Sequence, residues 1–399
     1  MKRILLLSMI LVCLISKSFS QCLDNSCDCI YSLAINEDIL WIGTKVGLYK
    51  YDIVKGTRTL YNTESTNLPH NYVSALKLGA DNSLWIGTYG GGIAKLKNDT
   101  WTIFNKSNSS IATNNIFDIE IFHDSILWLA SDKGVITYNS HDWGLFNQGN
   151  SSLTHDLVYS VTNEGDSVMW VGAHGGLSKF NGSWYRYTRE NSGLPHNIVY
   201  TTEIIGQSKY IGTMEGLATF NGYVWDTEFS EKTLVVKYEA SNGNLWAGTS
   251  SGFKRNLVDW DITYNTSNST LENNYIEDIT IDKYGNKWVA TWGGGVYRFN
   301  NSDFQKIDIL TSIVQLKDNP DIEVFPNPST DMVNIELNES FGDDIYIDLI
   351  DTRGLLIKRV RVEKIKNGIS IDISEFKAGI ILIKICDGKQ IIVKKIIRK

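Results

Sequence analysis

The stretch Leu84-Trp85-Ile86-Gly87-Thr88-Tyr89-Gly90-Gly91-Gly92-Ile93 decides the fold, because its first half recurs along the chain. Every copy centres on an aromatic residue that is followed by an apolar residue and then by Gly or Ala. Successive copies stand 36 to 44 residues apart, a spacing typical of repeat architectures. The seven aromatic anchors are Trp41, Trp85, Trp128, Trp170, Tyr210, Trp246 and Trp288.

Each repeat contains four short runs in which apolar residues alternate with polar ones. In the second repeat they span residues 72–78, 84–88, 92–96 and 101–105, with Gly, Asn, Asp or Ser between them. Such alternation predicts β-strands, and four strands in about 42 residues match one propeller blade. The sequence therefore predicts an all-β fold, with a seven-bladed β-propeller over residues 21–309. We expect the aromatic anchors to pack in the core between blades.

The pattern Leu-Trp-Ile-Gly-Thr-x-x-Gly-Gly, preceded by turns such as Leu68-Pro69-His70-Asn71 and Leu194-Pro195-His196-Asn197, resembles the two-component-regulator propeller repeat. That family occurs in the periplasmic sensor region of bacterial hybrid histidine kinases and in exported proteins of the Bacteroidetes. The resemblance implies the fold more than the function, because the matched residues are structural. No transmembrane helix or kinase follows, so signalling through this chain itself is not expected.

The repeat stops at residue 309, and residues 310–321 are expected to form a linker. Residues 322–399 alternate again and predict a small immunoglobulin-like β-sandwich. This segment contains Phe325-Pro326-Asn327-Pro328, Thr352-Arg353-Gly354, Asp372-Ile373-Ser374 and Ala378-Gly379-Ile380, and it ends in basic residues. It resembles the C-terminal sorting domain of the Bacteroidetes type IX secretion system, although Ile381 stands where that family usually carries Tyr. The resemblance implies passage through the outer membrane and removal of this domain, followed by release or attachment to surface lipopolysaccharide. The type IX secretion machinery is thus the expected partner.

Residues 1–20 read as a signal peptide, with Lys2 and Arg3 before an apolar stretch and a small-x-small site before Gln21. The apolar stretch is shorter than the roughly 20 residues of a membrane span, and no later segment approaches that length. A lipid anchor on Cys22 is an alternative that Phe19 and Gln21 fit poorly. We expect a secreted or outer-membrane surface location, reached through the periplasm.

Cysteines and charge limit the remaining classes of site. Cys22 is expected to pair with Cys27 or Cys29 in a local disulfide, since a structural zinc site would need a fourth ligand nearby. The net charge is −7, and the middle of the chain is more negative still because both ends are net positive, so a nucleic-acid partner is not expected. No cofactor and no metal are expected.

Candidate binding residues follow from propeller geometry, because the loops after the second strand of each blade gather around the channel on one face. Tyr89 and Trp292 are flanked by glycines and are expected to present flat rings to a sugar or peptide. Covering the channel mouth with no ligand is the alternative. The candidate residues are Lys45, Tyr89, Lys133, His174, Glu215, Ser250 and Trp292.

Polar residues also recur in the turn that leads into each repeat. His70, His155 and His196 share one slot there, and Asn114 and Asn273 are expected to fill it elsewhere. A ring of metal ligands is one interpretation. A turn residue that hydrogen-bonds the backbone is the interpretation we favour, because positions on separate blades do not converge on one ion.

Three functions remain open. A binding or scaffold module for an extracellular glycan or protein is favoured, because no catalytic constellation is found. The alternative is a propeller enzyme, a lyase or hydrolase with its site at the top of the channel. A purely structural surface component is the third.

Overall fold

The computed structural model describes residues 29–123, 125–256, 260, 262–307, 309, 322–337, 345–350, 356–362, 368–386 and 391–399. The signal peptide expected over 1–20, Cys22, Cys27 and the linker expected over 310–321 lie outside them. The chain divides into two compact units, of which one is Asp28–Ile309 and the other contains the C-terminal domain. Every regular element in the described ranges is a β-strand, so the predicted all-β class is confirmed.

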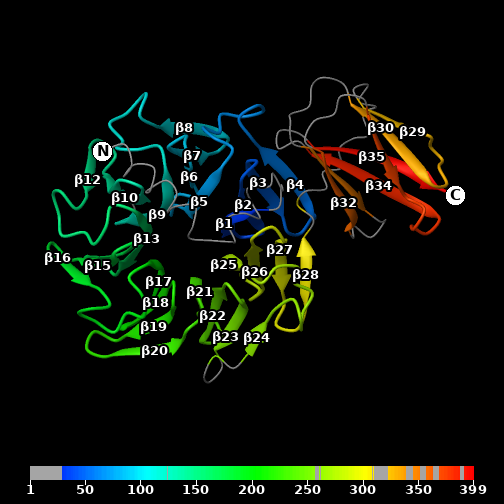
Figure 1. The fold of residues 1–399 in the computed structure, drawn as a ribbon. Helices are drawn as coiled ribbons and strands as arrows, with labels where there is room; N and C mark the ends of the chain where they lie inside the picture. Colours follow the sequence, from blue (N-terminus) through cyan, green and yellow to red (C-terminus); the bar gives the residue numbers. More distant parts are fainter. Residues whose placement is uncertain are drawn as a thin grey trace, which may run out of the picture. The chain divides into compact units, whose positions relative to one another are not determined.

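Seven four-stranded antiparallel sheets, each built from four strands consecutive in the chain, make up the first unit (Figure 1). The first is β1 (Ile30–Asn36), β2 (Ile39–Thr44), β3 (Leu48–Asp52) and β4 (Thr57–Tyr61). The second is β5 (Val73–Leu78), β6 (Leu84–Thr88), β7 (Ile93–Lys97) and β8 (Thr100–Phe104). The third is β9 (Ile116–Phe122), β10 (Ile126–Ser131), β11 (Gly134–Tyr138) and β12 (Trp143–Phe146). The fourth is β13 (Val158–Glu164), β14 (Val168–Ala173), β15 (Gly176–Phe180) and β16 (Trp184–Tyr187).

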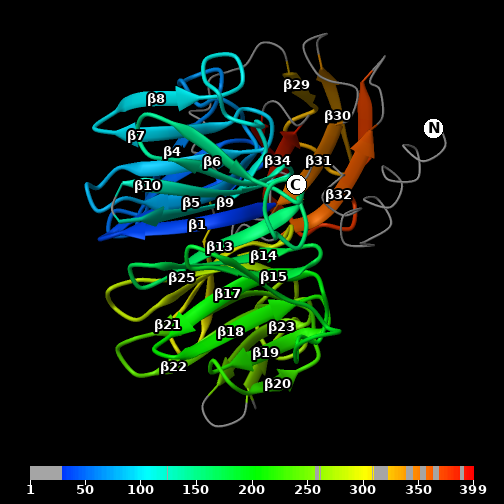
Figure 2. The same ribbon diagram turned by 90° about the vertical axis from the view of Figure 1, so that its left-hand side faces the viewer.

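The same order of strands continues to the end of the unit. The fifth sheet is β17 (Val199–Ile205), β18 (Ser208–Thr213), β19 (Gly216–Phe220) and β20 (Trp225–Phe229), which lie side by side in Figure 2. The sixth is β21 (Thr233–Glu239), β22 (Asn244–Thr249), β23 (Gly252–Asn256) and β24 (Ile262–Tyr264). The seventh is β25 (Ile276–Ile281), β26 (Lys287–Thr291), β27 (Gly295–Phe299) and β28 (Phe304–Ile307). These sheets are the blades of the predicted propeller.

The recurring pentapeptide forms the second strand of every blade, and its residues have distinct structural roles. Trp85, Trp128, Trp170, Trp246 and Trp288 are buried, whereas Trp41 and Tyr210 are half-buried. A Cβ added to Gly87 would lie 2.9 Å from Cγ2 of Ile116 in the next blade, so this Gly permits close packing between blades. The hydroxyl of Thr88 donates to the carbonyl of Gly92 at 2.9 Å, closing the following turn.

That turn itself requires glycine. Gly134 has φ +115°, and a Cβ there would lie 2.1 Å from the carbonyl oxygen of Phe146. Any other residue would be strained in this backbone conformation and would also clash with the outermost strand of its own blade.

The first strands of the blades surround the propeller axis, each beside the first strand of the next blade, and β25 lies beside β1. The ring is therefore closed by side-by-side packing of complete blades, not by a sheet shared between the two ends. The backbone amide of Leu33 in β1 donates to Oδ2 of Asp278 in β25 at 2.7 Å. Lys283 and Asp38 add an ion pair of 2.9 Å across the same seam. Closure covers the two blade faces that an open row of blades would leave exposed at its ends.

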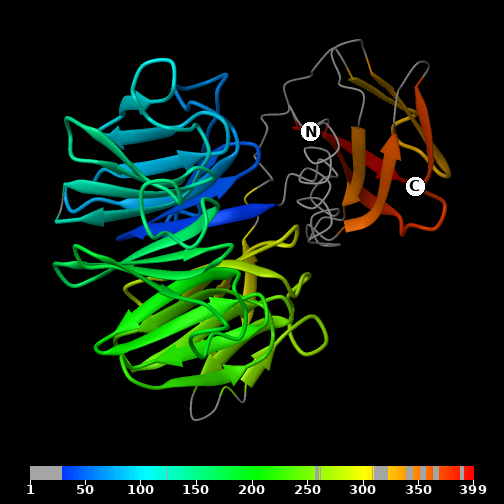
Figure 3. The same cartoon turned by 60° about the vertical axis from the view of Figure 1, so that its left-hand side comes forward.

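The second unit contains two sheets, drawn from orange to red in Figure 3. The first is β29 (Ile322–Phe325), β30 (Met332–Leu337) and β33 (Ile369–Asp372). The second is β32 (Leu356–Val362), β31 (Ile345–Ile350), β34 (Gly379–Cys386) and β35 (Ile391–Arg398). Buried aliphatic residues of both sheets, such as Ile335, Ile347 and Ile383, form one core. The unit is thus a small two-sheet β-domain, and its immunoglobulin-like character stays a prediction.

Candidate functional site

The two loops expected to form the binding surface meet at the same end of each blade. In blade 2 the amide of Tyr89, just after the second strand, donates to the carbonyl of Tyr72, just before the first strand. Equivalent bonds join residues 174 and 157, 214 and 198, 250 and 232, and 292 and 275, at 2.9–3.0 Å. We call the surface formed by these two sets of loops the loop face.

The predicted binding residues differ widely in their exposure on this face. Tyr89 has an exposed fraction of 48%, and Lys133 is exposed too. Glu215 is exposed and lies 3.5 Å from Arg189. Lys45, His174 and Ser250 are half-buried. Trp292, expected to present its ring as Tyr89 does, is instead 7% exposed, because it packs edge-on against Tyr31 and Tyr275.

A near-continuous chain of aromatic side chains surrounds the axis at the loop face. Tyr31 and Tyr72 have ring centroids 4.4 Å apart, and Tyr72 contacts Tyr89 at 5.4 Å. Farther round, Tyr159 and Tyr200 lie 5.3 Å apart. All seven blades contribute to this group, which we call the axial ring. Its members are Tyr31, Tyr72, Tyr89, Phe117, Tyr159, His174, Tyr200, Lys232, Tyr275 and Trp292.

The ring contains one cation, Lys232. Its ammonium lies 4.7 Å from the ring centroid of Tyr200 and 4.9 Å from that of Tyr275, and it donates a hydrogen bond to the hydroxyl of Tyr275. Such cation–π contacts stabilise a partly desolvated ammonium. Burial lowers the pKa of Lys232, and the nearby carboxyl of Glu277 opposes that shift.

Glu277 lies on β25 among the side chains of the axial ring. Burial raises its pKa to about 8, with Lys232 acting in the opposite direction. Burial likewise raises the pKa of Tyr31 to about 12, and the charge of Glu277 adds to that shift. At neutral pH the carboxyl of Glu277 is therefore mostly protonated, and the tyrosines are neutral hydrogen-bonding groups.

Farther along the inner strands, lysines lie among carboxyl groups. Lys77 of β5 lies 2.9 Å from Glu120 of β9. Burial alone would lower the pKa of Lys237, but the nearby carboxylates of Glu203 and Asp278 raise it.

The recurring histidines cap backbone turns. Nδ1 of His70, His155 and His196 accepts a hydrogen bond from the amide two residues later, at 2.9–3.0 Å. The side chain of Asn273 does the same. In the third repeat this role belongs to Thr113, so the expectation that Asn114 fills the slot is wrong. Asn114 instead accepts from the amide of Lys106, as Asn71 does from that of Thr63. These bonds support the turn interpretation.

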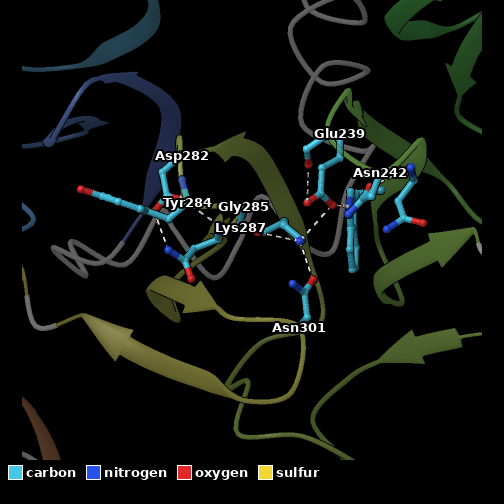
Figure 4. A network of polar contacts seen from close by, with 11 residues as sticks. Glu239, Asn242, Asp282, Tyr284, Gly285, Lys287 and Asn301 are labelled. Atoms are coloured by element: carbon cyan, nitrogen blue, oxygen red, sulfur yellow. Dashed lines mark hydrogen bonds and ion pairs between the residues drawn. The ribbon is translucent and has the colours of Figure 1, made fainter.

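The most enclosed polar cluster of the propeller joins blades 6 and 7 (Figure 4). Nζ of Lys287 lies 3.0 Å from Oε2 of Glu239, and it also donates to the carbonyl of Gly285 and to Oδ1 of Asn301. Nε1 of Trp246 donates to Glu239 at 2.8 Å. Both charged side chains are buried, so this cluster stabilises the seam and leaves nothing for a ligand.

Within the described part of the chain, no three His, Cys, Asp or Glu side chains are grouped so as to hold a metal ion. Cys29 is buried and disulfide-bonded, while Cys22 and Cys27 are outside the described residues. None of the described segments is a helix long and apolar enough to cross a membrane.

Comparison with known families identifies both parts of the chain. Residues 67–90 match the model described as two component regulator propeller, and residues 323–399 match the secretion system C-terminal sorting domain. The propeller is thus similar to the two component regulator propellers in one of its repeats, and the C-terminal unit is similar to the sorting domain. The sorting domain implies handling by the type IX secretion machinery and delivery outside the cell or to the outer-membrane surface.

Solved structures share the fold at low sequence identity. The extracellular domain of the hybrid two component system BT3049 from B. thetaiotaomicron is 16% identical (TM-score 0.61), and the match covers 94% of this chain and 56% of that one. PorZ, an essential surface component of the type-IX secretion system of Porphyromonas gingivalis, is 13% identical (TM-score 0.58), with 93% and 59% covered. A streptogramin B lyase is 13% identical (TM-score 0.55), with 68% and 93% covered. The chain thus spans less than two thirds of the first two proteins. No curated protein is similar enough in sequence to match.

The sorting domain brings its two most distinctive sequence features together. The side chain of Asn327, from the Pro-Asn-Pro segment, accepts from the amide of Ile397 and donates to the carbonyl of Lys395, both at 2.9 Å. The amide of Ser329 adds a bond to the carbonyl of Ile397. The entry of the domain is therefore tied to its basic C-terminal strand.

Sequence reasoning missed most of the axial ring, including Lys232 and Glu277. A signal was present, because Tyr occurs beside the first apolar residue of the inner strand in five repeats. These are Tyr31, Tyr72, Tyr159, Tyr200 and Tyr275. In some repeats the Tyr precedes this apolar residue and in others it follows it, so the tyrosines do not fall at one position when the repeats are aligned.

Proposed function

We propose that this chain is an exported binding module that uses the loop face of its propeller to hold an extracellular glycan or protein. The observation that carries the proposal is the axial ring, to which all seven blades contribute aromatic or polar side chains. Aromatic faces at a rigid surface suit the C–H faces of sugars and the side chains of peptides.

We propose binding without catalysis. The alternative of a lyase or hydrolase draws on other propellers, and the likeness to streptogramin B lyase concerns the fold alone. Two of the carboxyls near the axis are engaged otherwise: Asp278 accepts backbone amides from Leu33 and Ile279, and Glu120 pairs with Lys77. Such anchored carboxylates are poor general acids or bases.

The test is binding of the full-length exported chain to glycan and peptide arrays. Tyr89→Ala is the informative variant, since Tyr89 is the exposed ring of the loop face, whereas loss of the buried Trp292 would disturb the fold. Tyr223→Ala is the matched control, because Tyr223 is 91% exposed on the β19–β20 hairpin. We expect saturable binding that Tyr89→Ala weakens and Tyr223→Ala preserves. Absence of any saturable ligand, with cooperative unfolding intact, would favour a purely structural role.

A further inference from the structure

Lys232 differs from three other enclosed lysines of the propeller in having no carboxylate within ion-pair distance. Lys209, Lys254 and Lys287 each lie within 3.0 Å of a glutamate, namely Glu164, Glu231 and Glu239. Among the described residues, no carboxylate lies within ion-pair distance of Lys232, whose contacts are the hydroxyl of Tyr275 and the ring of Tyr200. An ammonium has three donors, so Lys232 retains hydrogen-bonding capacity for a ligand.

The nearest acid does not compensate this charge at neutral pH. Glu277 is surrounded by Tyr31, Tyr72, Tyr200 and Tyr275, whose pKa values it raises, and Asp278 is the acid beside it. Because its own pKa is raised to about 8, Glu277 is mostly neutral at pH 7. The axial ring thus carries a net positive charge in a desolvated aromatic surrounding.

The axial ring also indicates which chemical group of the ligand lies next to its anionic group. Tyr200 and Tyr275 are both half-buried, and their ring centroids lie 4.7 and 4.9 Å from the ammonium of Lys232, so aromatic side chains border the cation. Sugars present both a flat C–H face and, when acidic, a carboxylate or similar group. A cationic ligand would be repelled by Lys232.

Building on the proposed function, we infer that the axial ring binds an acidic saccharide, with Lys232 receiving its anionic group and the neighbouring rings of Tyr200 and Tyr275 lying beside its sugar ring. Glu277 then acts as a competitor, because in its ionised form it attracts Lys232 and repels the anion. Binding should therefore strengthen as the pH falls from 9 to 6.

The experiment uses the full-length exported chain and an array of acidic and neutral saccharides and acidic peptides. The best-bound acidic saccharide is then titrated by calorimetry at pH 6 and pH 9, beside the same saccharide with its carboxyl groups reduced to alcohols. We expect the reduced form to bind about tenfold more weakly at pH 6. This comparison needs no variant, so it stands even where a substitution impairs folding.

Variants assign the effect to Lys232. Lys232→Met should lose about tenfold in affinity, Lys232→Arg should retain most of it, and Glu277→Gln should bind equally at both pH values. Lys179→Met is the matched control, since Lys179 lies 5.4 Å from the ring centroid of Trp170, away from the axis.

The outcomes separate the inference from the proposed function. Binding of neutral saccharides or acidic peptides alone, or unchanged affinity in Lys232→Met, would overturn the inference and leave the binding module intact. No binding to any probe would overturn both.

Discussion

Lys287 and Glu239 form an ion pair that protein encloses on all sides, with side chains 0% and 3% exposed and 3.0 Å between Nζ and Oε2. Although burial acts in the opposite direction, the hydrogen bonds from Lys287 and Trp246 hold the pKa of Glu239 below its usual value. Lys209 and Glu164 repeat the arrangement between blades 4 and 5, with Trp170 in place of Trp246. Each pair joins the first strand of one blade to the second strand of the next.

Removing one partner of the enclosed pair should be far more costly than removing both. Lys287→Leu leaves Glu239 buried without its cation, and we expect a loss of about 3–5 kcal/mol in the free energy of unfolding. The double variant Lys287→Leu/Glu239→Gln should recover much of that loss, because four other repeats carry Leu at this position. Denaturant unfolding of the three proteins measures both values. Equal stability of the single and double variants would show that the pair is not coupled.

The carboxylate of Asp278 should matter more than its counterpart Asp118. Both accept the backbone amide of the neighbouring blade, from Leu33 at 2.7 Å and from Val161 at 2.9 Å. The bond of Asp278 joins blade 7 to blade 1, which are not consecutive in the chain. The bond of Asp118 joins blades 3 and 4, which the polypeptide also connects directly. Asp278→Ala and Asp118→Ala should therefore each lower the free energy of unfolding by about 1–3 kcal/mol. Only Asp278→Ala should also expose β1 to proteolysis. Identical cleavage patterns would contradict this.

Stability should depend on pH through Glu277. Its pKa is about 8 in the folded chain, above the ordinary 4.5, so between these values the folded state binds more protons than the unfolded state. The free energy of unfolding therefore falls as the pH rises from 5 to 8. Glu277→Gln removes that contribution and should be up to about 4 kcal/mol more stable than wild type at pH 8, with little difference at pH 5. Thermal melts at both pH values measure it, and Glu272→Gln, from an exposed ion pair, serves as the control. A stability difference independent of pH would exclude this titration.

The turn histidines should be replaceable by asparagine. Nδ1 of His196 accepts the amide of Ile198 at 2.9 Å, and Asn273 makes the same bond through its side-chain oxygen. His196→Asn should leave the melting temperature nearly unchanged, whereas His196→Ala should cost about 1 kcal/mol. A melting temperature that falls on addition of a chelator would instead revive a metal-binding role.

Asn327 should be required for an intact sorting domain. Asn327→Ala loses two hydrogen bonds to the C-terminal strand and should destabilise the domain by about 1–2 kcal/mol. We expect less of the chain at the cell surface or in the medium, measured by fractionation and blotting. Ser370→Ala, which removes an exposed side-chain hydrogen bond in the same domain, should export normally. Normal export of Asn327→Ala would show that the machinery tolerates a loosened strand.

The sequence by itself determined the blades and the sorting domain. The period of the Trp motif, the alternation within each run and the glycines between runs are local features, so they report which residues pair within one blade. For the same reason, the face that holds Tyr89 and His174 could be chosen from the position of their loops. The turn position of the third repeat was predicted at Asn114 and not at Thr113, because a shift of one residue within a turn leaves the repeat pattern unchanged.

Only the tertiary structure decided what meets at the axis. Lys232, Glu277 and Tyr31 belong to three different blades, and closure of the ring brings Glu277 close to the other two. Burial then sets the chemistry, because desolvation among aromatic rings raises the pKa of Glu277 and leaves the charge of Lys232 uncompensated at neutral pH. Sequence periodicity describes neighbours within a blade, whereas the chemistry of the axis depends on contacts between blades that are far apart in the chain.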